Sequence, residues 1–415
     1  MRVKVWMMGL LLALLVGPVA MAQPLAYEAE ETAVQSEASQ DDRQAADSIS
    51  VSLLTCSPGQ EVYSLYGHTA IRCVVRRAGD DLDVVFNYGV FSFSQPHFIW
   101  RFVLGKCDYM VEASYFDGFL NAYARRGSRV TEQVLSLTPE EARSVLSYLM
   151  TNCAPGNNQY RYNFLYNNCT TMVRDVIERC VQGKVLYAPR TPQMTTRQIL
   201  HQYTQGHPWA AEGDDLLLGS AVDTLASDRA AMFAPEYMMD YAAHAVVRDV
   251  RGQERPLVAA THVLTPGVDV PVEPEFPLSP RQTGWGVLIF ALLLMLVEWW
   301  RGRAFALWSV LLLLAQGLVG SLLLFMALCS EHPAVGSNWL LWPFCPLALV
   351  GIYFALRPGH RCAARWWMAY FCFLTLFLLF YPLIPQNFGN IVVPLTMSLL
   401  TRPIGFYLCS IRNRK

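Results

Sequence analysis

Cys169 directly follows two asparagines in the segment LYNNCTTMVRDVIERC, residues 165–180. Because asparagine is a favoured N-cap, Asn167 or Asn168 predicts a helix whose first turn contains Cys169. Unpaired backbone N–H groups and the positive end of the helix dipole lower the pKa of a thiol there, and the same N–H groups can hold an oxyanion. The segment therefore predicts a nucleophilic cysteine. A buried inert thiol and half of a disulfide are the alternatives.

His68 could serve as the base for this thiol. It lies in SLYGHTAIRC, near the start of a predicted strand. A papain-like site requires a helix-borne cysteine that faces a strand-borne histidine, which a third polar group orients. The runs GHTAIRCVV and DVVFNYGVF, separated by the turn-prone RAGDD, predict a hairpin. Its second strand offers Asn87 or Asp83 for the third role.

The composition gives no sign of nucleic-acid binding, and its apolar residues are unevenly distributed along the chain. The net charge is −1, and the sequence contains no basic run and no zinc-type cysteine spacing. Charged residues make up 16% and hydrophobic residues 53% of the chain, whereas soluble proteins carry about 25% charged residues. The apolar excess lies at the extreme N-terminus and beyond residue 284. The sequence therefore predicts a membrane protein with a water-exposed central domain.

The N-terminus predicts export. Residues 1–22 combine two early positive charges, a short apolar stretch and an A-x-A site at Ala20 and Ala22, as a cleaved signal peptide does. An uncleaved anchor is the alternative. Residues 23–50 contain seven acidic residues against one arginine, which predicts a disordered tail.

Mixed strand and helix patterns over residues 51–264 predict an α+β domain. One helix begins with a capping box at Thr138 and Glu141. Residues 265–283 form a proline-rich linker, and residues 284–410 form an all-α transmembrane domain of about five helices. The expected spans are 285–299, 304–327, 338–356, 367–384 and 391–409.

Loop charges orient these spans. Arginines follow the first and third spans and basic residues close the chain, while the loops SEHPAVGSN and PQNFGN contain neither lysine nor arginine. The positive-inside rule then places the central domain in the periplasm and the C-terminus in the cytoplasm, provided that the last span crosses. The protein is thus expected in the inner (cytoplasmic) membrane.

Six cysteines fall in the exported part, where an oxidising compartment permits disulfides. Their spacing reveals no framework, so their pairing stays open. They are Cys56, Cys73, Cys107, Cys153, Cys169 and Cys180.

The order of histidine first and cysteine later resembles the circularly permuted papain-like (NlpC/LRAT-like) superfamily, which includes the lecithin:retinol acyltransferases. Within it, LLTCSPGQEVYSLYGHTAIRC, VFNYG, FVLGKCDYMVEASYF and YRYNFLYNNCTT resemble the periplasmic domain of the Lnb-type lipoprotein N-acyltransferases of Gram-negative bacteria. SEHPAVGSNWLLWPFCPL resembles the membrane segment of that family. The resemblance covers most of residues 51–409.

The resemblance implies a permuted papain-like fold in which Cys169 carries the acyl group and His68 is its base. The superfamily uses a polar residue of the next strand as the third member, and Asn87 is preferred here to Asp83. The implied reaction moves an acyl chain from a phospholipid, through a cysteine thioester, to the α-amine of a diacylated lipoprotein. It implies no metal and no other cofactor.

Three more residues are candidates for substrate binding. His332 and Asn338 fall in a loop predicted to face the periplasm, where a histidine could contact a lipid head group or the incoming amine. Arg72 shares a strand face with His68 and could hold a phosphate, although a solvated arginine is the alternative.

Two rival functions remain open at this point. A membrane-tethered cysteine amidase or peptidase of the cell wall would use the same pair of side chains, with water as the acceptor. It would need only one span for tethering. A non-catalytic membrane scaffold would leave Cys169 inert and make the two motifs coincidental.

Overall fold

The computed structural model describes residues 48–77, 81–92, 96–190, 193–268 and 276–413. The described chain divides into two compact units. The first, the sheet unit, ends at residue 268 and omits residues 205–224. The second, the helical unit, consists of residues 205–224 and the chain from residue 276. The predicted signal peptide and most of the predicted acidic tail lie outside the described residues.

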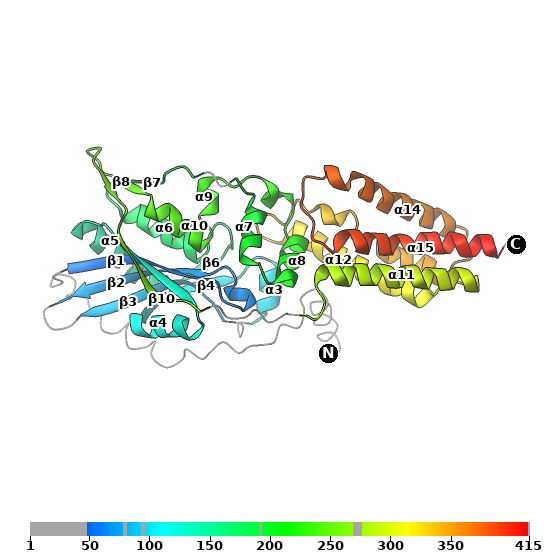
Figure 1. The fold of residues 1–415 in the computed structure, drawn as a ribbon, viewed down its shortest axis with the longest axis horizontal. Helices are drawn as coiled ribbons and strands as arrows, with labels where there is room; N and C mark the ends of the chain where they lie inside the picture. Colours follow the sequence, from blue (N-terminus) through cyan, green and yellow to red (C-terminus); the bar gives the residue numbers. More distant parts are fainter. Residues whose placement is uncertain (1–47, 78–80, 93–95, 191–192, 269–275, 414–415) are drawn as a thin grey trace. The chain divides into compact units, whose positions relative to one another are not determined.

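A seven-stranded antiparallel sheet forms the centre of the sheet unit, in the order β10-β5-β1-β2-β3-β4-β6 (Figure 1). The predicted hairpin is confirmed as β2 and β3. Ser48 pairs with Arg76, so residues 48–50, predicted in the disordered tail, begin the sheet instead. The strands are β1 Ser48–Cys56, β2 His68–Arg76, β3 Leu82–Val90, β4 Asp108–Tyr115, β5 Arg129–Leu135, β6 Gln159–Arg161 and β10 Val258–Pro266.

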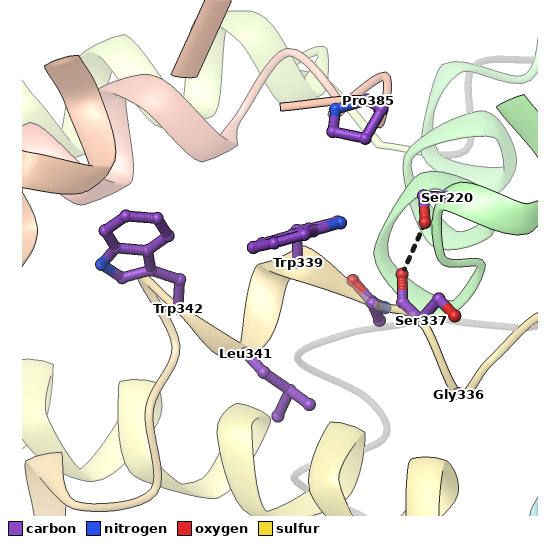
Figure 2. A pocket seen from close by; sticks show the side chains of 8 residues that line it. Ser220, Gly336, Ser337, Trp339, Leu341, Trp342 and Pro385 are labelled. Atoms are coloured by element: carbon purple, nitrogen blue, oxygen red, sulfur yellow. Dashed lines mark hydrogen bonds between the residues drawn. The ribbon is translucent and has the colours of Figure 1, made fainter. Parts of the chain in front are cut away.

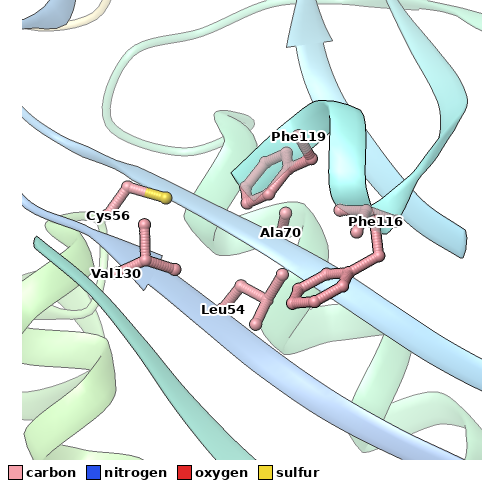
Figure 3. Packing of buried hydrophobic residues seen from close by; sticks show 7 residues of the cluster. Leu54, Cys56, Ala70, Phe116, Phe119 and Val130 are labelled. Carbon is pink, nitrogen blue, oxygen red and sulfur yellow. The ribbon is translucent and has the colours of Figure 1, made fainter. Parts of the chain in front are cut away.

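Helices cover both faces of this sheet. α5 Pro139–Cys153 and α6 Cys169–Cys180 lie on one face, and α4 Phe116–Arg125 lies on the other (Figure 1). Figure 3 shows Phe116 and Phe119 of α4 packed over the buried strand residues Leu54, Cys56, Ala70 and Val130. Val85 belongs to the same cluster. Burial of this apolar surface stabilises the layered arrangement.

The other elements of the sheet unit are short. The predicted capping box of α5 is confirmed, since the Thr138 hydroxyl accepts from the Glu141 N–H and the Glu141 carboxylate accepts from the Thr138 N–H. A small second sheet has the order β7-β8-β9. The elements are η2 Val62–Ser64, α3 Phe98–Val103, β7 Lys184–Leu186, α7 Thr196–Tyr203, α9 Asp228–Ala231, α10 Pro235–Ala243, β8 Val246–Arg248 and β9 Glu254–Pro256.

Four helices among the described residues are long and apolar enough to cross a membrane. They are α11 Pro280–Arg301, α12 Ala306–Cys329, α14 Ala363–Phe380 with its extension η5 Tyr381–Leu383, and α15 Val392–Arg412. They coincide with the first, second, fourth and fifth predicted spans. α11 begins at Pro280, so the last four residues of the predicted linker 265–283 are helical. The first two residues of that linker are the last two of β10.

The predicted span 338–356 is helical only in part. It contains the 3-10 turn η4 Trp339–Leu341 and the nine-residue helix α13 Ala348–Leu356. Pro343 and Pro346 lie between the two, and a proline has no N–H to donate within a helix. The two prolines therefore disfavour a continuous helix over this stretch.

Residues 205–224, predicted within the central domain, belong instead to the helical unit. This segment contains α8 Pro208–Leu217 and η3 Ser220–Asp223. The Glu212 carboxylate accepts from the N–H groups of Asn390 and Ile391 at the start of α15. The Asn338 amide donates to the Leu216 carbonyl at 2.8 Å. Because these partners lie more than a hundred residues away along the chain, local patterns could not predict the contacts.

Candidate active site

Cys169 is the first residue of α6, and Asn168 is the N-cap. The Asn168 Oδ1 atom accepts from the N–H groups of Thr170 and Thr171 at 3.0 and 2.9 Å. Its Nδ2 atom donates to the carbonyls of Phe164 and Phe233. The Asn168 side chain is thus fixed by four hydrogen bonds, and the residue positions Cys169 at the helix start. The Cys169 thiol is half-buried and free, and forms no disulfide.

His68 is the first residue of β2, and two neighbours orient its ring. Its Nε2 atom lies 3.2 Å from Oδ1 of Asn87, on β3. Its ring stacks on that of Tyr123, with centroids 6.1 Å apart and planes 9° from parallel. Because a carbonyl oxygen only accepts, this contact places the proton of the neutral ring on Nε2 and leaves Nδ1 as an acceptor.

Asn87 is itself held in place, since its Nδ2 atom donates to the Ser114 hydroxyl of β4 at 3.3 Å. Asp83 binds Arg72 through both carboxylate oxygens, at 2.8 and 2.6 Å. Of the two residues that the sequence left open, the structure therefore brings Asn87 to His68.

The imidazole stabilises the thiolate form of Cys169. Burial raises the pKa of Cys169, but the charge of His68 and hydrogen bonds from His68, the Thr69 N–H and the Thr170 hydroxyl outweigh it and lower the pKa to about 7. Burial lowers the pKa of His68, but the Cys169 thiolate and the Asn87 hydrogen bond raise it above its usual value overall. The arrangement can thus hold a thiolate beside an imidazolium near neutral pH.

The other cysteines of the sheet unit lack this environment. Burial raises the pKa of each of them, so each stays a protonated thiol at neutral pH. They are Cys56, Cys73, Cys107, Cys153 and Cys180.

Gly89 lies beside Cys169, and the Tyr160 hydroxyl lies close to Gly89; the sequence patterns above singled out neither residue. Gly89 has φ +95°, and a Cβ atom there would lie 3.4 Å from the Cys169 Cβ and 3.9 Å from the Tyr160 hydroxyl oxygen. The glycine in VFNYG was the available signal, because a positive φ favours glycine. The absence of a side chain at Gly89 keeps open the space next to the Cβ atom of Cys169.

Arg72 lies within the sheet unit and is already paired. It forms ion pairs with Asp83 at 2.6 Å and Glu132 at 2.9 Å, and its guanidinium lies 3.4 Å from the centre of the Phe116 ring. Two carboxylates therefore neutralise its charge, which favours a structural role over the predicted phosphate contact.

His332 and Asn338 belong to the helical unit, in the loop that follows α12. Asn338 is buried, caps η4 and accepts from the Gln386 amide at 3.1 Å. It also lines a cavity of about 570 Å³. Figure 2 shows Trp339, Trp342 and Pro385 around this cavity, with the Ser220 hydroxyl bonded to the Ser337 carbonyl.

Comparison with known proteins identifies the family. The family model of the Lnb N-terminal periplasmic domain matches residues 36–202, and the model of the Lnb transmembrane domain matches residues 272–414. No curated protein and no solved structure matches the chain. The first match contains Cys169 and His68, and the second contains all four membrane-length helices. Together the two matches show that the chain belongs to the Lnb family of lipoprotein N-acyltransferases.

Proposed function

We propose that this protein N-acylates the diacylglyceryl-cysteine of bacterial lipoproteins, through a thioester on Cys169 and with a phospholipid as the acyl donor. The observation that carries the proposal is the Cys169 thiol, whose pKa is lowered to about 7 beside a histidine that Asn87 orients. A permuted papain-like arrangement would use these three residues as nucleophile, base and orienting group.

The first half-reaction forms the thioester. His68 accepts the thiol proton, and the Cys169 sulfur attacks the ester carbonyl carbon of the phospholipid. The N–H groups of Thr170 and Thr171 bind the Asn168 side chain. The Cys169 N–H, at the first helical position, is therefore the one placed to donate to the oxyanion. The carbon–oxygen bond then breaks, and His68 returns its proton to the leaving lysophospholipid oxygen.

The second half-reaction transfers the acyl chain. The α-amine of the diacylated lipoprotein attacks the thioester carbonyl, and His68 accepts the proton that the amine loses. The carbon–sulfur bond breaks to give an amide and the Cys169 thiolate, which the protonated His68 neutralises. The second substrate binds only after the first product has left, so the kinetics are ping-pong.

The proposed location is the inner membrane, with the sheet unit in the periplasm and the C-terminus in the cytoplasm. This orientation requires an odd number of crossings, so the stretch of η4 and α13 would be a fifth crossing beside the four long helices. Arg301 ends α11, Arg357 follows α13 and Arg412 ends α15, and the positive-inside rule places such residues in the cytoplasm. A reporter fused after Lys415 should then behave as cytoplasmic. A periplasmic signal from it would contradict this orientation.

Complementation tests the reaction. In cells depleted of their own lipoprotein N-acyltransferase, the protein should convert diacylated lipoprotein N-termini to triacylated ones, as read by mass spectrometry. Cys169→Ser and His68→Ala should abolish conversion, and Cys329→Ser, at an exposed cysteine of the helical unit, is the matched control. During turnover Cys169 should carry a hydroxylamine-sensitive acyl group.

Two results would count against the proposal. Lipoprotein amines that stay free with the wild type present would sink the acyltransferase assignment, and release of cell-wall peptides becomes the next assay. Acylation that persists in Cys169→Ser would rule out the thioester route.

A further inference from the structure

A row of aromatic rings extends from the thiol across the sheet unit. The Tyr160 hydroxyl oxygen and the Cys169 Cβ atom both lie within 4 Å of the position that a Cβ atom would take at Gly89. Tyr160 pairs directly with Tyr109 across β6 and β4. The centroid distances along the row are 4.1 Å for Tyr162–Tyr109, 4.8 Å for Tyr109–Phe91, 5.9 Å for Phe91–Phe98 and 6.3 Å for Phe98–Phe102. Neighbouring rings therefore lie in contact from Tyr162 to α3, and strand pairing places Tyr160 opposite Tyr109 at the inner end of the row.

α3 is the outer end of this row, and its apolar side chains face solvent. Ile99 is 57% exposed, Trp100 48% and Phe102 45%. Tyr63, also exposed, packs edge-on against Phe91 at 6.3 Å. We name these four residues the α3 patch. Grouped large apolar side chains on a surface mark a site of interaction with another apolar surface.

The composition of the α3 patch favours a bilayer as its partner. Tryptophan and tyrosine are enriched where membrane meets water, and basic residues next to them are attracted to anionic lipids. Lys106 lies three residues beyond the end of α3, whereas Arg101, within α3, is paired with Asp108. The same chain contains four helices of membrane-spanning length, so the α3 patch belongs to a protein that is held at a bilayer.

We propose that the α3 patch inserts into the lipid surface of the membrane, and that the ring row guides one acyl chain of a phospholipid from there to Cys169. The second part rests on the proposed function, since it supplies the acyl donor of that reaction. The row suits this role because successive ring faces and edges offer an apolar wall without directional hydrogen bonds.

Fluorescence quenching in liposomes tests the insertion with the full chain. A fluorescent amino acid at Ile99 should be quenched by phospholipids that carry a nitroxide on the acyl chain. The same label at Val250, 89% exposed in the same unit, is the control and should be quenched only by iodide in the water. Iodide quenching at position 99 would overturn the proposal. Shielding of position 99 from both quenchers would also overturn it, because protein would then cover the patch.

Comparing two acyl donors, one in a membrane and one soluble in water, distinguishes a defect in lipid access from a defect in the reactivity of Cys169. Trp100→Glu should lower Cys169 acylation from phospholipid liposomes by about ten-fold or more, because a buried carboxylate is costly at a lipid surface. Acetylation by water-soluble p-nitrophenyl acetate should stay unchanged, and Trp100→Phe should keep the phospholipid rate. Val250→Glu is the matched control. An unchanged phospholipid rate in Trp100→Glu, or an equal loss with both donors, would contradict the guided path.

The two proposals fail in different ways. A wild-type protein that takes the acetyl group but no acyl chain from phospholipid would refute the proposed donor. The quenching result would still decide whether the α3 patch lies in the membrane.

Discussion

His68 and Asn87 lie on neighbouring strands of one antiparallel sheet, with 3.2 Å between Nε2 of the first and Oδ1 of the second. Asn87 is held in turn by Ser114 on the next strand. The orientation of the imidazole is therefore set by three adjacent strands, whereas the thiol comes from a helix that packs on the sheet. Rigid elements hold the interacting side chains more precisely than loops could.

Replacement of Asn87 should slow thioester formation without abolishing it. Asn87→Ala removes the acceptor for the Nε2 proton, so the ring loses its fixed tautomer and orientation. A general base contributes about 10²–10⁴-fold, and an orienting residue should contribute less than the base itself. Single-turnover acylation of Cys169 measures the effect, with Ser114→Ala as a milder variant. A loss in Asn87→Ala as large as in His68→Ala would show that Asn87 is more than an orienting group.

Alkylation of Cys169 should depend on pH with a midpoint near 7. Only the thiolate reacts, and the lowered pKa of about 7 means that the rate rises as the pH is raised through 7 and falls below it. His68→Ala removes the charge and the hydrogen bond that stabilise the thiolate, so the midpoint should move upward. Mass spectrometry of iodoacetamide-labelled peptides across a pH series measures both.

Cys153 is the internal control for this experiment, because burial raises its pKa to about 12. It should stay unlabelled in the folded protein across the series. Equal labelling of Cys153 and Cys169 at pH 7 would mean that the helix start confers no special reactivity.

Local patterns predicted much of the site. The N-cap asparagine placed Cys169 at a helix start, and period-two runs placed His68 on a hairpin. The sequence also contained information that favours Asn87 over Asp83 as the residue that orients His68. Asp83 pairs with Val74, six residues along β2 from His68, whereas Asn87 lies further along the returning strand. A turn at RAGDD implies this register.

Long-range contacts could not be predicted. Glu132 is sixty residues from Arg72, and the pattern of β5 gives no sign that its carboxylate meets that guanidinium. The docking of residues 205–224 on the helical unit depends on side chains such as Asn338, whose partners come from distant segments. The span over 338–356 was predicted from its apolar residues alone. Hydropathy does not reflect the backbone N–H groups that Pro343 and Pro346 lack, and the helix is interrupted there.

Loss of Arg72 should destabilise the sheet unit and leave substrate affinity unchanged. Arg72→Ala leaves the nearly buried carboxylate of Glu132 without its cation, which costs about 3 kcal/mol. In a unit of this size that corresponds to a decrease in melting temperature of roughly 6–12 °C. Thermal unfolding and the KM for phospholipid are the two measurements. A raised KM with an unchanged melting temperature would restore the phosphate-binding role.

The buried ion pair between α11 and α15 supplies a prediction for the helical unit. Arg402 Nη1 lies 2.9 Å from Glu298 Oε1, and both side chains are 1% exposed. The Phe305 N–H also donates to Glu298, and the Thr401 hydroxyl contacts the guanidinium. Arg402→Ala leaves a carboxylate buried without a cation, which should cost about 3–5 kcal/mol.

A double replacement separates the cost of an unpaired charge from the contribution of the pair. Glu298→Met with Arg402→Met removes both charges and fills the space with apolar atoms, so it should restore most of the stability lost in Arg402→Ala. Melting temperature in detergent and accumulation in the membrane measure the effect, and Arg281→Ala, at an exposed arginine of the same unit, is the matched control. The double variant should retain acyl transfer, because the pair lies outside the unit that holds Cys169. A double variant that folds but does not acylate lipoproteins would place the ion pair in the reaction itself, and its role would then exceed the packing of two helices.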